Sequence, residues 1–317
     1  MFPRPAVLVA AAFAAGVNAA ALAPAAAALP AASFSPLRFA GPAKTPQSLV
    51  YVSEFSTSTI DVFAQKGNGQ QKLGTITSGI SFPSGLWVDG QRNLWVTNQS
   101  SANANGYILE FPPGASTPSQ QIDQPAGYAL PTEVWRHSDG TLWIIDVTTY
   151  GGGYVVEYVP GTQTWSIIND PNVLFETGIT GDKKGDIYVS GLSGTGAEVD
   201  VLKKGTSEWV NTGISLPYES GELAIDAQGN LVVADPFEQT VQTFAPGKNK
   251  PIHTIKCPGG CTDIAFDSTG RRLWNVVSPN ATTIQELTYP EGRLVDTIDV
   301  DQNSEPAGIA ASPGLYP

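Results

Sequence analysis

Leu94-Trp-Val-Thr-Asn98 is a short apolar segment that ends in polar residues, and the chain contains this pattern six times. The other copies are Leu49-Val-Tyr-Val-Ser53, Leu142-Trp-Ile-Ile-Asp146, Ile187-Tyr-Val-Ser-Gly191, Leu231-Val-Val-Ala-Asp235 and Leu273-Trp-Asn-Val-Val277. Their starts are separated by 45, 48, 45, 44 and 42 residues. A fixed period with several strands per unit is typical of a β-propeller with one blade per repeat. The repeat therefore predicts an all-β, six-bladed β-propeller with four antiparallel strands per blade.

The second repeat illustrates the expected blade. Its four strands are predicted at Gly85–Asp89, Leu94–Thr97, Tyr107–Phe111 and 119–122, with Gly-containing turns between them. The second strand of each unit is apolar on successive residues, which indicates that both of its faces are covered by neighbouring blades. The tryptophans that fall in these strands are expected to pack between blades: Trp87, Trp95, Trp135, Trp143 and Trp274.

The frame of the repeat predicts how the ring closes. The array begins at the second strand of a blade, at Leu49, and ends with an unpaired inner strand, Ala307–Ala311. We therefore expect this C-terminal strand to complete the first blade, which leaves no open sheet edge in the ring.

The N-terminal segment has the layout of a secretory signal peptide. A positive start at Arg4 is followed by an apolar run from Ala6 to Val17, which is too short for a membrane span. Cleavage is expected between Ala20 and Ala32, and an uncleaved Ala/Pro-rich tail is the alternative. The predicted organisation is a signal peptide at 1–30, a linker at 31–46 and the propeller at 47–317, in a secreted or periplasmic protein without a lipid-bearing cysteine.

The charge of the chain limits its partners. A formal net charge of −12 argues against nucleic-acid binding and against docking on anionic membranes. We expect a monomer that does not insert into membranes.

The two cysteines, Cys257 and Cys261, enclose a Pro-Gly-Gly turn. In an exported chain an even number of cysteines favours a disulfide, here across a turn between two blades. Free or reactive thiols are the alternative interpretation.

The repeats resemble those of known propellers. Pro83–Asp89 with Asn93–Asn98, and Gly221–Asp226 with Gly229–Asp235, resemble the NHL-type repeat, and they are similar to the gluconolactonase (regucalcin)-like and virginiamycin B lyase-like propellers. The resemblance covers residues 47–317. It implies the six-bladed superfamily and says little of activity, because it consists of strand and turn residues.

Acidic residues are expected to gather where the central channel opens. The starts of inner strands and the ends of second strands meet there, and they carry Glu54, Asn98, Glu133, Asp146, Glu176, Glu219, Glu222, Asp235, Asp263 and Glu305. Converging carboxylate oxygens suit Ca²⁺. We predict Glu133, Glu222, Asp263 and Glu54 as the metal ligands if an ion is bound.

The resemblance implies two chemistries. Gluconolactonase-like relatives use a metal to polarise a lactone, but their early Glu-Gly-Pro and Asn-Gly motifs are not found here. The lyase-like relatives need a catalytic His with a Glu and Mg²⁺. His137 is expected in a turn on the opposite face and His253 on an outer strand, both as ordinary surface residues.

We therefore predict an exported propeller that binds a small ligand or a protein on its loop face without catalysis. The alternative is a divalent-metal-dependent lactonase or hydrolase, and a purely structural surface component is a third possibility. The loops Gln99–Gly106 and Thr148–Gly153 are candidate binding loops. Asn98 and Asn280 lie in glycosylation sequons.

Overall fold

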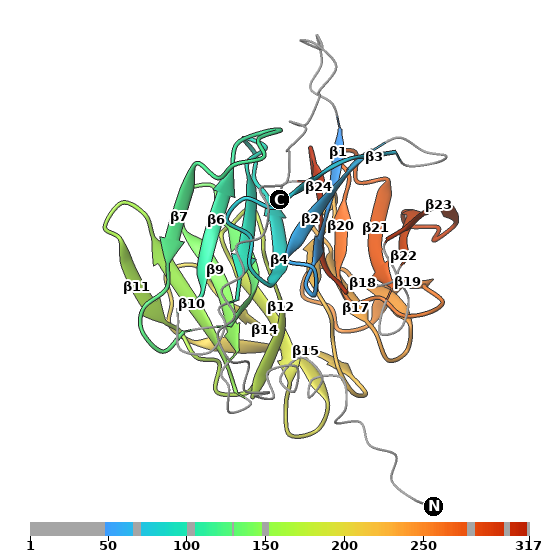
Figure 1. Cartoon of the computed structure of the whole chain (residues 1–317). Helices are drawn as coiled ribbons and strands as arrows, with labels where there is room; N and C mark the ends of the chain where they lie inside the picture. The colour runs from blue at the N-terminus through green and yellow to red at the C-terminus, as the bar shows by residue number, and fades with distance from the viewer. Residues whose placement is uncertain are drawn as a thin grey trace, which may run out of the picture.

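The protein forms six four-stranded antiparallel sheets arranged around a centre (Figure 1). The computed structural model describes residues 48–65, 71–99, 105–128, 130–147, 152–277, 283–300 and 305–315. The predicted six-bladed, four-stranded propeller is confirmed. Asn280, part of the 99–106 loop and most of the 148–153 loop lie outside the described residues.

Each blade has an inner, a second, a third and an outer strand. The inner strands are β24 (Pro306–Ser312), β4 (Pro83–Val88), β8 (Pro131–Arg136), β12 (Phe175–Gly181), β16 (Leu223–Ile225) and β20 (Ile264–Phe266). The second strands are β1 (Leu49–Glu54), β5 (Leu94–Asn98), β9 (Leu142–Val147), β13 (Ile187–Leu192), β17 (Leu231–Asp235) and β21 (Arg272–Val277). The third strands are β2 (Thr59–Ala64), β6 (Tyr107–Phe111), β10 (Gly153–Val159), β14 (Ala197–Leu202), β18 (Thr240–Phe244) and β22 (Thr283–Thr288). The outer strands are β3 (Lys72–Ile76), β7 (Gln120–Asp123), β11 (Thr164–Ile167), β15 (Trp209–Leu216), β19 (Pro251–Lys256) and β23 (Leu294–Asp299).

A recurrent aspartate shapes the turn between inner and second strands. Asp89 Oδ1 accepts hydrogen bonds from the backbone N–H groups of Gln91 and Asn93, both at 2.9 Å. Asp226 repeats this arrangement with Gln228 at 2.9 Å and Asn230 at 2.8 Å. Aspartate favours such turns because its short side chain reaches backbone donors a few residues ahead. This aspartate of the repeat therefore has a structural role.

The C-terminal strand closes the ring as predicted. β24 pairs with β1 in the order β24-β1-β2-β3, and the register places Leu49 opposite Ser312 and Val52 opposite Ile309. Figure 1 shows the red C-terminal strand beside the blue first strand. β24 also packs against β4 and β20 of the two flanking blades. The first blade is thus built from both ends of the described chain.

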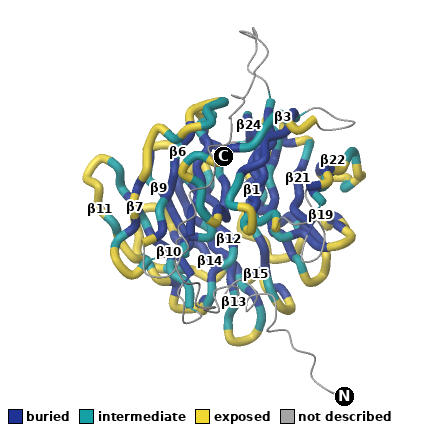
Figure 2. The backbone as a smooth tube through the Cα atoms, viewed as in Figure 1, coloured by how far each residue is buried: buried dark blue, intermediate teal, exposed yellow. Residues whose placement is uncertain are grey.

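The hydrophobic core is divided among the six interfaces between neighbouring blades. One buried cluster, for example, joins Trp135 and Ile145 of the third blade to Ile179 and Val189 of the fourth. Every residue of β9 is buried, which confirms that second strands are covered on both faces. Figure 2 shows this burial within the sheets, with exposed residues in the turns and outer strands.

The strand tryptophans take part in these interfaces. The rings of Trp87 and Trp135 lie 6.2 Å apart across two blades, and Trp274 is fully buried between the sixth blade and the first. Trp95 and Trp143 are buried in clusters of the same kind. The prediction of inter-blade packing is confirmed for these residues.

The closing strand leads to a prediction about truncations. Removing residues 306–317 would expose the edge of β1 and the flanks of β4 and β20. Because a domain has only about 5–15 kcal/mol of stability, this loss should abolish the cooperative unfolding transition. Removing residues 1–40, which precede the repeat, should leave the melting temperature within about 2 °C of the full chain. Thermal unfolding followed by circular dichroism measures both, and equal melting temperatures for the two truncations would contradict the closure role.

Candidate site at the channel mouth

One equivalent position on the six inner strands faces the central channel, and it carries either an acid or a glycine. Register and backbone hydrogen bonds place these residues opposite Ser53, Thr97, Ile145, Ser190, Ala234 and Val276 of the second strands. We call this set the channel ring, and its members in blade order are Gly308, Gly85, Glu133, Gly178, Glu222 and Asp263. The sixfold repeat thus places three acids that are distant in sequence at equivalent positions, where they form one layer across the channel.

The acids of the channel ring lie over glycines of neighbouring blades. Glu222 Oε1 accepts a hydrogen bond from the N–H of Ile179, directly after Gly178, at 3.3 Å. Asp263 Oδ2 accepts one from the N–H of Ile309, directly after Gly308, at 3.0 Å. A Cβ atom on Gly178 would lie 2.5 Å from the carbonyl oxygen of Gly221 and 2.9 Å from Glu222 Cα. The close approach of the inner strands therefore requires glycine there.

Hydroxyl groups tie the glycine-bearing blades to their neighbours. Ser53 Oγ donates to the carbonyl oxygen of Ser84 at 2.6 Å and accepts from the N–H of Gly308 at 2.7 Å. Ser190 Oγ donates to the carbonyl oxygen of Gly221 at 3.1 Å. Each of these hydroxyls sits opposite a glycine of the channel ring. The missing side chain lets the hydroxyl reach across to the next blade.

The pKa values of all three acids are raised, mainly by burial. Burial raises the pKa of Glu133 well above its ordinary value, and the nearby charges of Glu222 and Asp263 raise it further. Burial and the charge of Asp263 raise the pKa of Glu222 in the same direction. Burial raises the pKa of Asp263 to about 8, although the backbone N–H groups of Ile309 and Ile264 lower it. Like charges in an apolar setting oppose ionisation, so this layer retains protons near neutral pH.

An apolar layer lies next to the acids along the channel. The residue after each channel-ring position is aliphatic and buried: Leu86, Val134, Ile179, Leu223, Ile264 and Ile309. All of these except Ile179 line a small cavity of about 40 Å³ together with Glu222 and Asp263. The low polarity of this surface explains why burial is the main cause of the raised pKa values of the acids.

A larger cavity of about 140 Å³ opens at the mouth of the channel. Its acidic lining residues are Glu133, Glu176 and Glu219, and its walls are mostly apolar, with Leu130, Val147, Phe175, Pro236 and Ala307 among them. No lysine, arginine or histidine is among the described residues that line it. The cavity therefore combines an apolar body with carboxyl groups.

Glu176 is the most enclosed acid of this cavity. It is only 1 % exposed, and its Oε2 has no hydrogen-bond partner among the described residues. The carboxyl group lies against the Cα of Gly153 on the neighbouring blade, where any side chain would collide with it. Burial, with a smaller contribution from the charge of Asp170, raises the pKa of Glu176 to about 7. A buried carboxyl oxygen without a donor is costly, and a ligand that supplied one would offset that cost.

Exposed apolar residues surround the mouth. The loops that enter inner strands or leave second strands open on one face, which we call the mouth face. Among the described residues it carries Phe82, Leu174, Tyr218 and Phe237, which are 37–63 % exposed. The rings of Tyr218 and Phe237 lie 3.7 Å apart, and those of Phe55 and Phe82 lie 5.4 Å apart. The other large exposed apolar residues in the described ranges, Ile167, Val210, Ile252 and Leu294, lie on outer strands.

We call the opposite face, which carries the remaining turns, the basic face because nearly all described lysines and arginines lie there, although the same turns also carry Asp89, Asp139, Asp182, Asp186, Asp226 and Asp267. Every described lysine and arginine except Lys256 lies in or beside those turns: Lys72, Arg92, Arg136, Lys183, Lys184, Lys203, Lys204, Lys248, Lys250, Arg271, Arg272 and Arg293. Lys256 ends β19 on the mouth side. The positive charges of the described residues are therefore concentrated on one face of the disc.

Three of the four predicted metal ligands meet in the channel ring, namely Glu133, Glu222 and Asp263. Glu54 is buried at the mouth end of β1, opposite Pro306, where the pairing with β24 is irregular, and it is not among the residues lining the mouth cavity. Within the described ranges, no group of three or more His, Cys, Asp or Glu side chains could hold a metal ion. Backbone N–H groups already occupy one oxygen of Glu222 and one of Asp263. This donor set fits a divalent ion poorly, and the metal assignment stays a prediction.

The other acids near the mouth have varied roles. Glu176 and Glu219 line the mouth cavity, as their sequence positions indicated. Asp235 Oδ1 accepts a hydrogen bond from the N–H of Glu238 at 2.9 Å and so caps the following loop. Asp146 is buried, and its burial raises its pKa to about 7. Asn98 Oδ1 accepts from the N–H of Ser81 at 3.0 Å, which orders the entry to β4.

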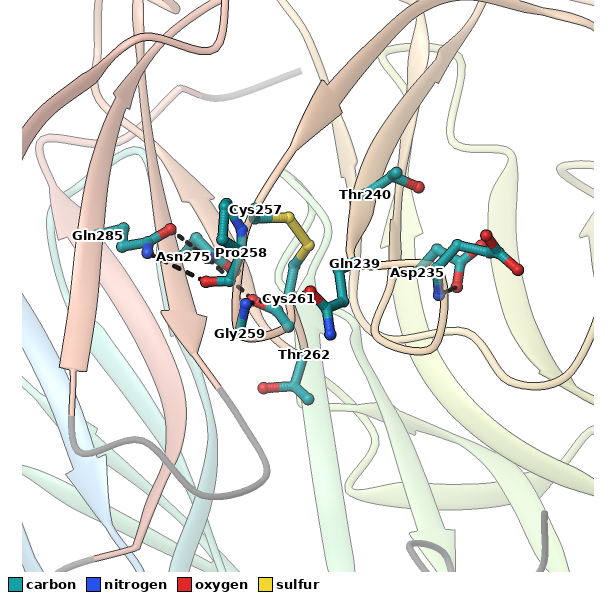
Figure 3. The surroundings of a disulfide bond; sticks show 12 residues. Asp235, Gln239, Thr240, Cys257, Pro258, Gly259, Cys261, Thr262, Asn275 and Gln285 are labelled. Atoms are coloured by element: carbon teal, nitrogen blue, oxygen red, sulfur yellow. Dashed lines mark hydrogen bonds between the residues drawn. A yellow bond between two sulfur atoms is a disulfide. The ribbon is translucent and has the colours of Figure 1, made fainter. Parts of the chain in front are cut away.

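Cys257 and Cys261 form a disulfide, as predicted, in the connection from β19 to β20 (Figure 3). Both cysteines are fully buried in the interface between the fifth and sixth blades. The turn between them is held from both sides, since Gly259 N–H donates to Gln239 Oε1 at 3.2 Å and Asn275 Nδ2 donates to the carbonyl oxygen of Gly260 at 3.3 Å. The disulfide therefore fixes one loop of the mouth face.

Both histidines lie away from the mouth. His253 is exposed on the outer strand β19. His137 follows β8 on the basic face, but its side chain is only 14 % exposed, because it packs beside Trp135 with ring centroids 5.7 Å apart. Its Nδ1 lies 2.9 Å from Asp139 Oδ2. The expectation that His137 is an ordinary surface residue is therefore only partly met.

Comparisons with known proteins support the fold and leave the activity open. No protein-family model and no curated protein matches the chain. Among solved structures, a nidogen/laminin complex has a TM-score of 0.68 at 13 % identity, covering 83 % of this chain and 98 % of that one. Virginiamycin B lyase from Staphylococcus aureus has a TM-score of 0.52 at 16 % identity, with 71 % and 73 % covered. A gluconolactonase from Xanthomonas campestris has a TM-score of 0.54 at 17 % identity, with 73 % and 82 % covered. At these identities the likeness concerns the fold alone.

The raised pKa values of the channel ring predict an unusual pH dependence of stability. The unfolded chain releases these protons near pH 4, whereas the folded protein holds them to higher pH, about 8 for Asp263. Between these two pH values the native state therefore binds more protons than the unfolded chain. The contribution of the three acids to the free energy of unfolding falls as the pH rises through this range. Glu222→Gln, which keeps the acceptor for Ile179, should stabilise the protein by roughly 1–3 kcal/mol at pH 8 and little at pH 4.5. Melting temperatures across this range measure the effect.

The matched control is Glu208→Gln, because Glu208 is exposed in a turn of the basic face. The melting temperature of this control variant should change with pH as that of the wild-type protein does. A Glu222→Gln curve that runs parallel to wild type from pH 4.5 to 8 would show that Glu222 ionises normally.

Proposed function

We propose that this protein is an exported propeller that binds a ligand at its channel mouth without catalysis. The observation that carries the proposal is the 140 Å³ mouth cavity, whose apolar walls lead out to exposed apolar side chains. Large exposed apolar residues that gather around a concave site commonly mark a binding surface. The rigid six-bladed disc supplies a preformed site, and the loops supply its specificity.

Export is supported by three observations. The sequence of residues 1–30 has the layout of a signal peptide, and the Cys257–Cys261 disulfide suits an oxidising compartment. In the described part of the chain, no helix has the length and apolar character needed to cross a membrane. The proposed location is therefore outside the cytoplasm, and we also propose that the protein is a monomer.

The aromatic pair Tyr218–Phe237 provides a test of binding at the mouth. In ligand-observed NMR, a set of phenyl fragments carrying ammonium, hydroxyl or carboxylate groups should include binders at millimolar concentration. The double variant Tyr218→Ser, Phe237→Ser should weaken those binders at least tenfold, because each lost aromatic face removes on the order of 1 kcal/mol or more of apolar contact.

The matched control is Ile252→Ser, Leu294→Ser, which removes two comparably exposed apolar side chains from outer strands. It should leave binding within about twofold of wild type. An absence of any fragment binding, or equal losses in the two double variants, would remove the mouth as the binding site.

The alternative, a divalent-metal-dependent lactonase or hydrolase, draws support from the meeting of Glu133, Glu222 and Asp263 and from the gluconolactonase fold likeness. It predicts a rise in melting temperature with added Ca²⁺ or Mg²⁺ that Glu133→Gln abolishes. Our proposal predicts no response up to millimolar concentrations, because the acids retain protons and their oxygens accept backbone hydrogen bonds. A metal-dependent rise that is lost in Glu133→Gln would favour the enzyme.

A further inference from the structure

We infer that the ligand of the mouth cavity is an organic cation, with an ammonium or guanidinium group on a flat apolar body. This inference rests on the proposed binding function and specifies its ligand class. Three features carry it: the enclosed carboxyl group of Glu176, the mainly apolar walls, and the scarcity of basic residues among the described residues of the mouth face.

Glu176 supplies the point of attachment. Glu176 is one of the residues that line the cavity, it is almost fully buried, and its Oε2, which packs against Gly153, has no hydrogen-bond donor among the described residues. The acids that face the same region are Glu133 and Glu219 in the cavity lining and Asp170 in the loop before β12. A donor that also carries positive charge would satisfy the free oxygen and offset the repulsion among these acids.

The walls determine the rest of the ligand. Leu130, Val147 and Phe175 line the cavity, and Tyr218 and Phe237, whose rings are tilted by 38°, are the sequence neighbours of the lining residues Glu219 and Pro236. Such a surface suits a flat hydrocarbon or aromatic body, and aromatic faces also attract cations. A bare metal ion would leave these walls without a partner. The structure therefore favours an amphipathic organic cation over an inorganic one.

The charge distribution supports the same ligand class. Nearly all described lysines and arginines lie on the basic face, while carboxyl groups line the mouth cavity. A carboxyl group that ionises at the mouth therefore has few described cations near it, which favours the approach of a cation over that of an anion.

Calorimetric titration of the full chain with three matched probes tests the inference: 2-phenylethylamine, 2-phenylethanol and 3-phenylpropanoate. At pH 8 the ammonium should bind at least about tenfold more tightly than the alcohol, since hydrogen bonds to charged groups contribute about 1.5–3 kcal/mol. The carboxylate should bind most weakly. At pH 7, near the pKa of Glu176, ammonium binding should release up to about half a proton per complex, which titrations in buffers of different ionisation enthalpy measure.

Glu176→Gln should reduce ammonium affinity at least about fivefold, remove the proton release, and leave alcohol affinity within about twofold. The control Glu238→Gln removes the same charge from an exposed loop position of the mouth face and should retain the preference. If Glu176→Gln lowers the melting temperature, the proton release of the wild-type protein still decides the question.

The outcomes separate the two proposals. Equal binding of ammonium and alcohol without proton release, with both lost in Tyr218→Ser, Phe237→Ser, would overturn the cation and leave the binding site standing. Preferential binding of the carboxylate would do the same. A loss of the ammonium preference in Glu238→Gln as large as in Glu176→Gln would show that general charge, and not the enclosed carboxyl group, selects the ligand. Binding of no probe, together with no fragment binding at the mouth, would overturn both.

Discussion

The pairing of β24 with β1 is the constraint on which the rest of the molecule depends. It makes six separate sheets into a ring, so that each blade buries both faces and each inner strand has a neighbour on either side. Two contacts secure it at the channel: Gly308 N–H donates to Ser53 Oγ, and Ile309 N–H donates to Asp263 Oδ2. The second contact joins the closing strand to an acid of the channel ring. Closure of the ring therefore also positions Asp263, one of the three acids of the channel ring.

The channel ring shows how a repeat fold makes room for ionisable groups. Six identical large residues could not converge on one axis, and glycines at three positions leave the space that the three acids occupy. Glu222 and Asp263 accept hydrogen bonds from backbone N–H groups, and the neighbouring aliphatic layer disfavours the ionised forms of all three acids. Such an arrangement stabilises the fold less than an apolar core would. One of these acids, Glu133, also lines the mouth cavity, so the acidic layer and the proposed binding site share a residue.

The sequence predicted the fold in detail because strand periodicity, turn glycines and the repeat length act locally and recur six times. The residues at the start of the inner strands, including Glu133, Glu222 and Asp263, could be assigned to the channel for the same reason. Glu54 shows the limit of this approach: its strand could be assigned, but the irregular pairing at Ser53 and Glu54 that sets its position depends on a partner far along the chain. The free oxygen of Glu176 and the Tyr218–Phe237 contact also depend on loop conformations and neighbouring blades, which no local pattern encodes.

The wide sequence separation of β24 and β1 has a consequence for biosynthesis. Leu49 meets Ser312, so the contact that completes the ring joins residues near the two ends of the described array. A nascent chain can form the middle blades as each emerges, but the first blade lacks its inner strand until residues 306–312 emerge. Until then the free edge of β1 and the flanks of the neighbouring blades are open to other strands. The ring can therefore close only after residues 306–312 have emerged, and a chain that lacks them is the form most exposed to misassembly.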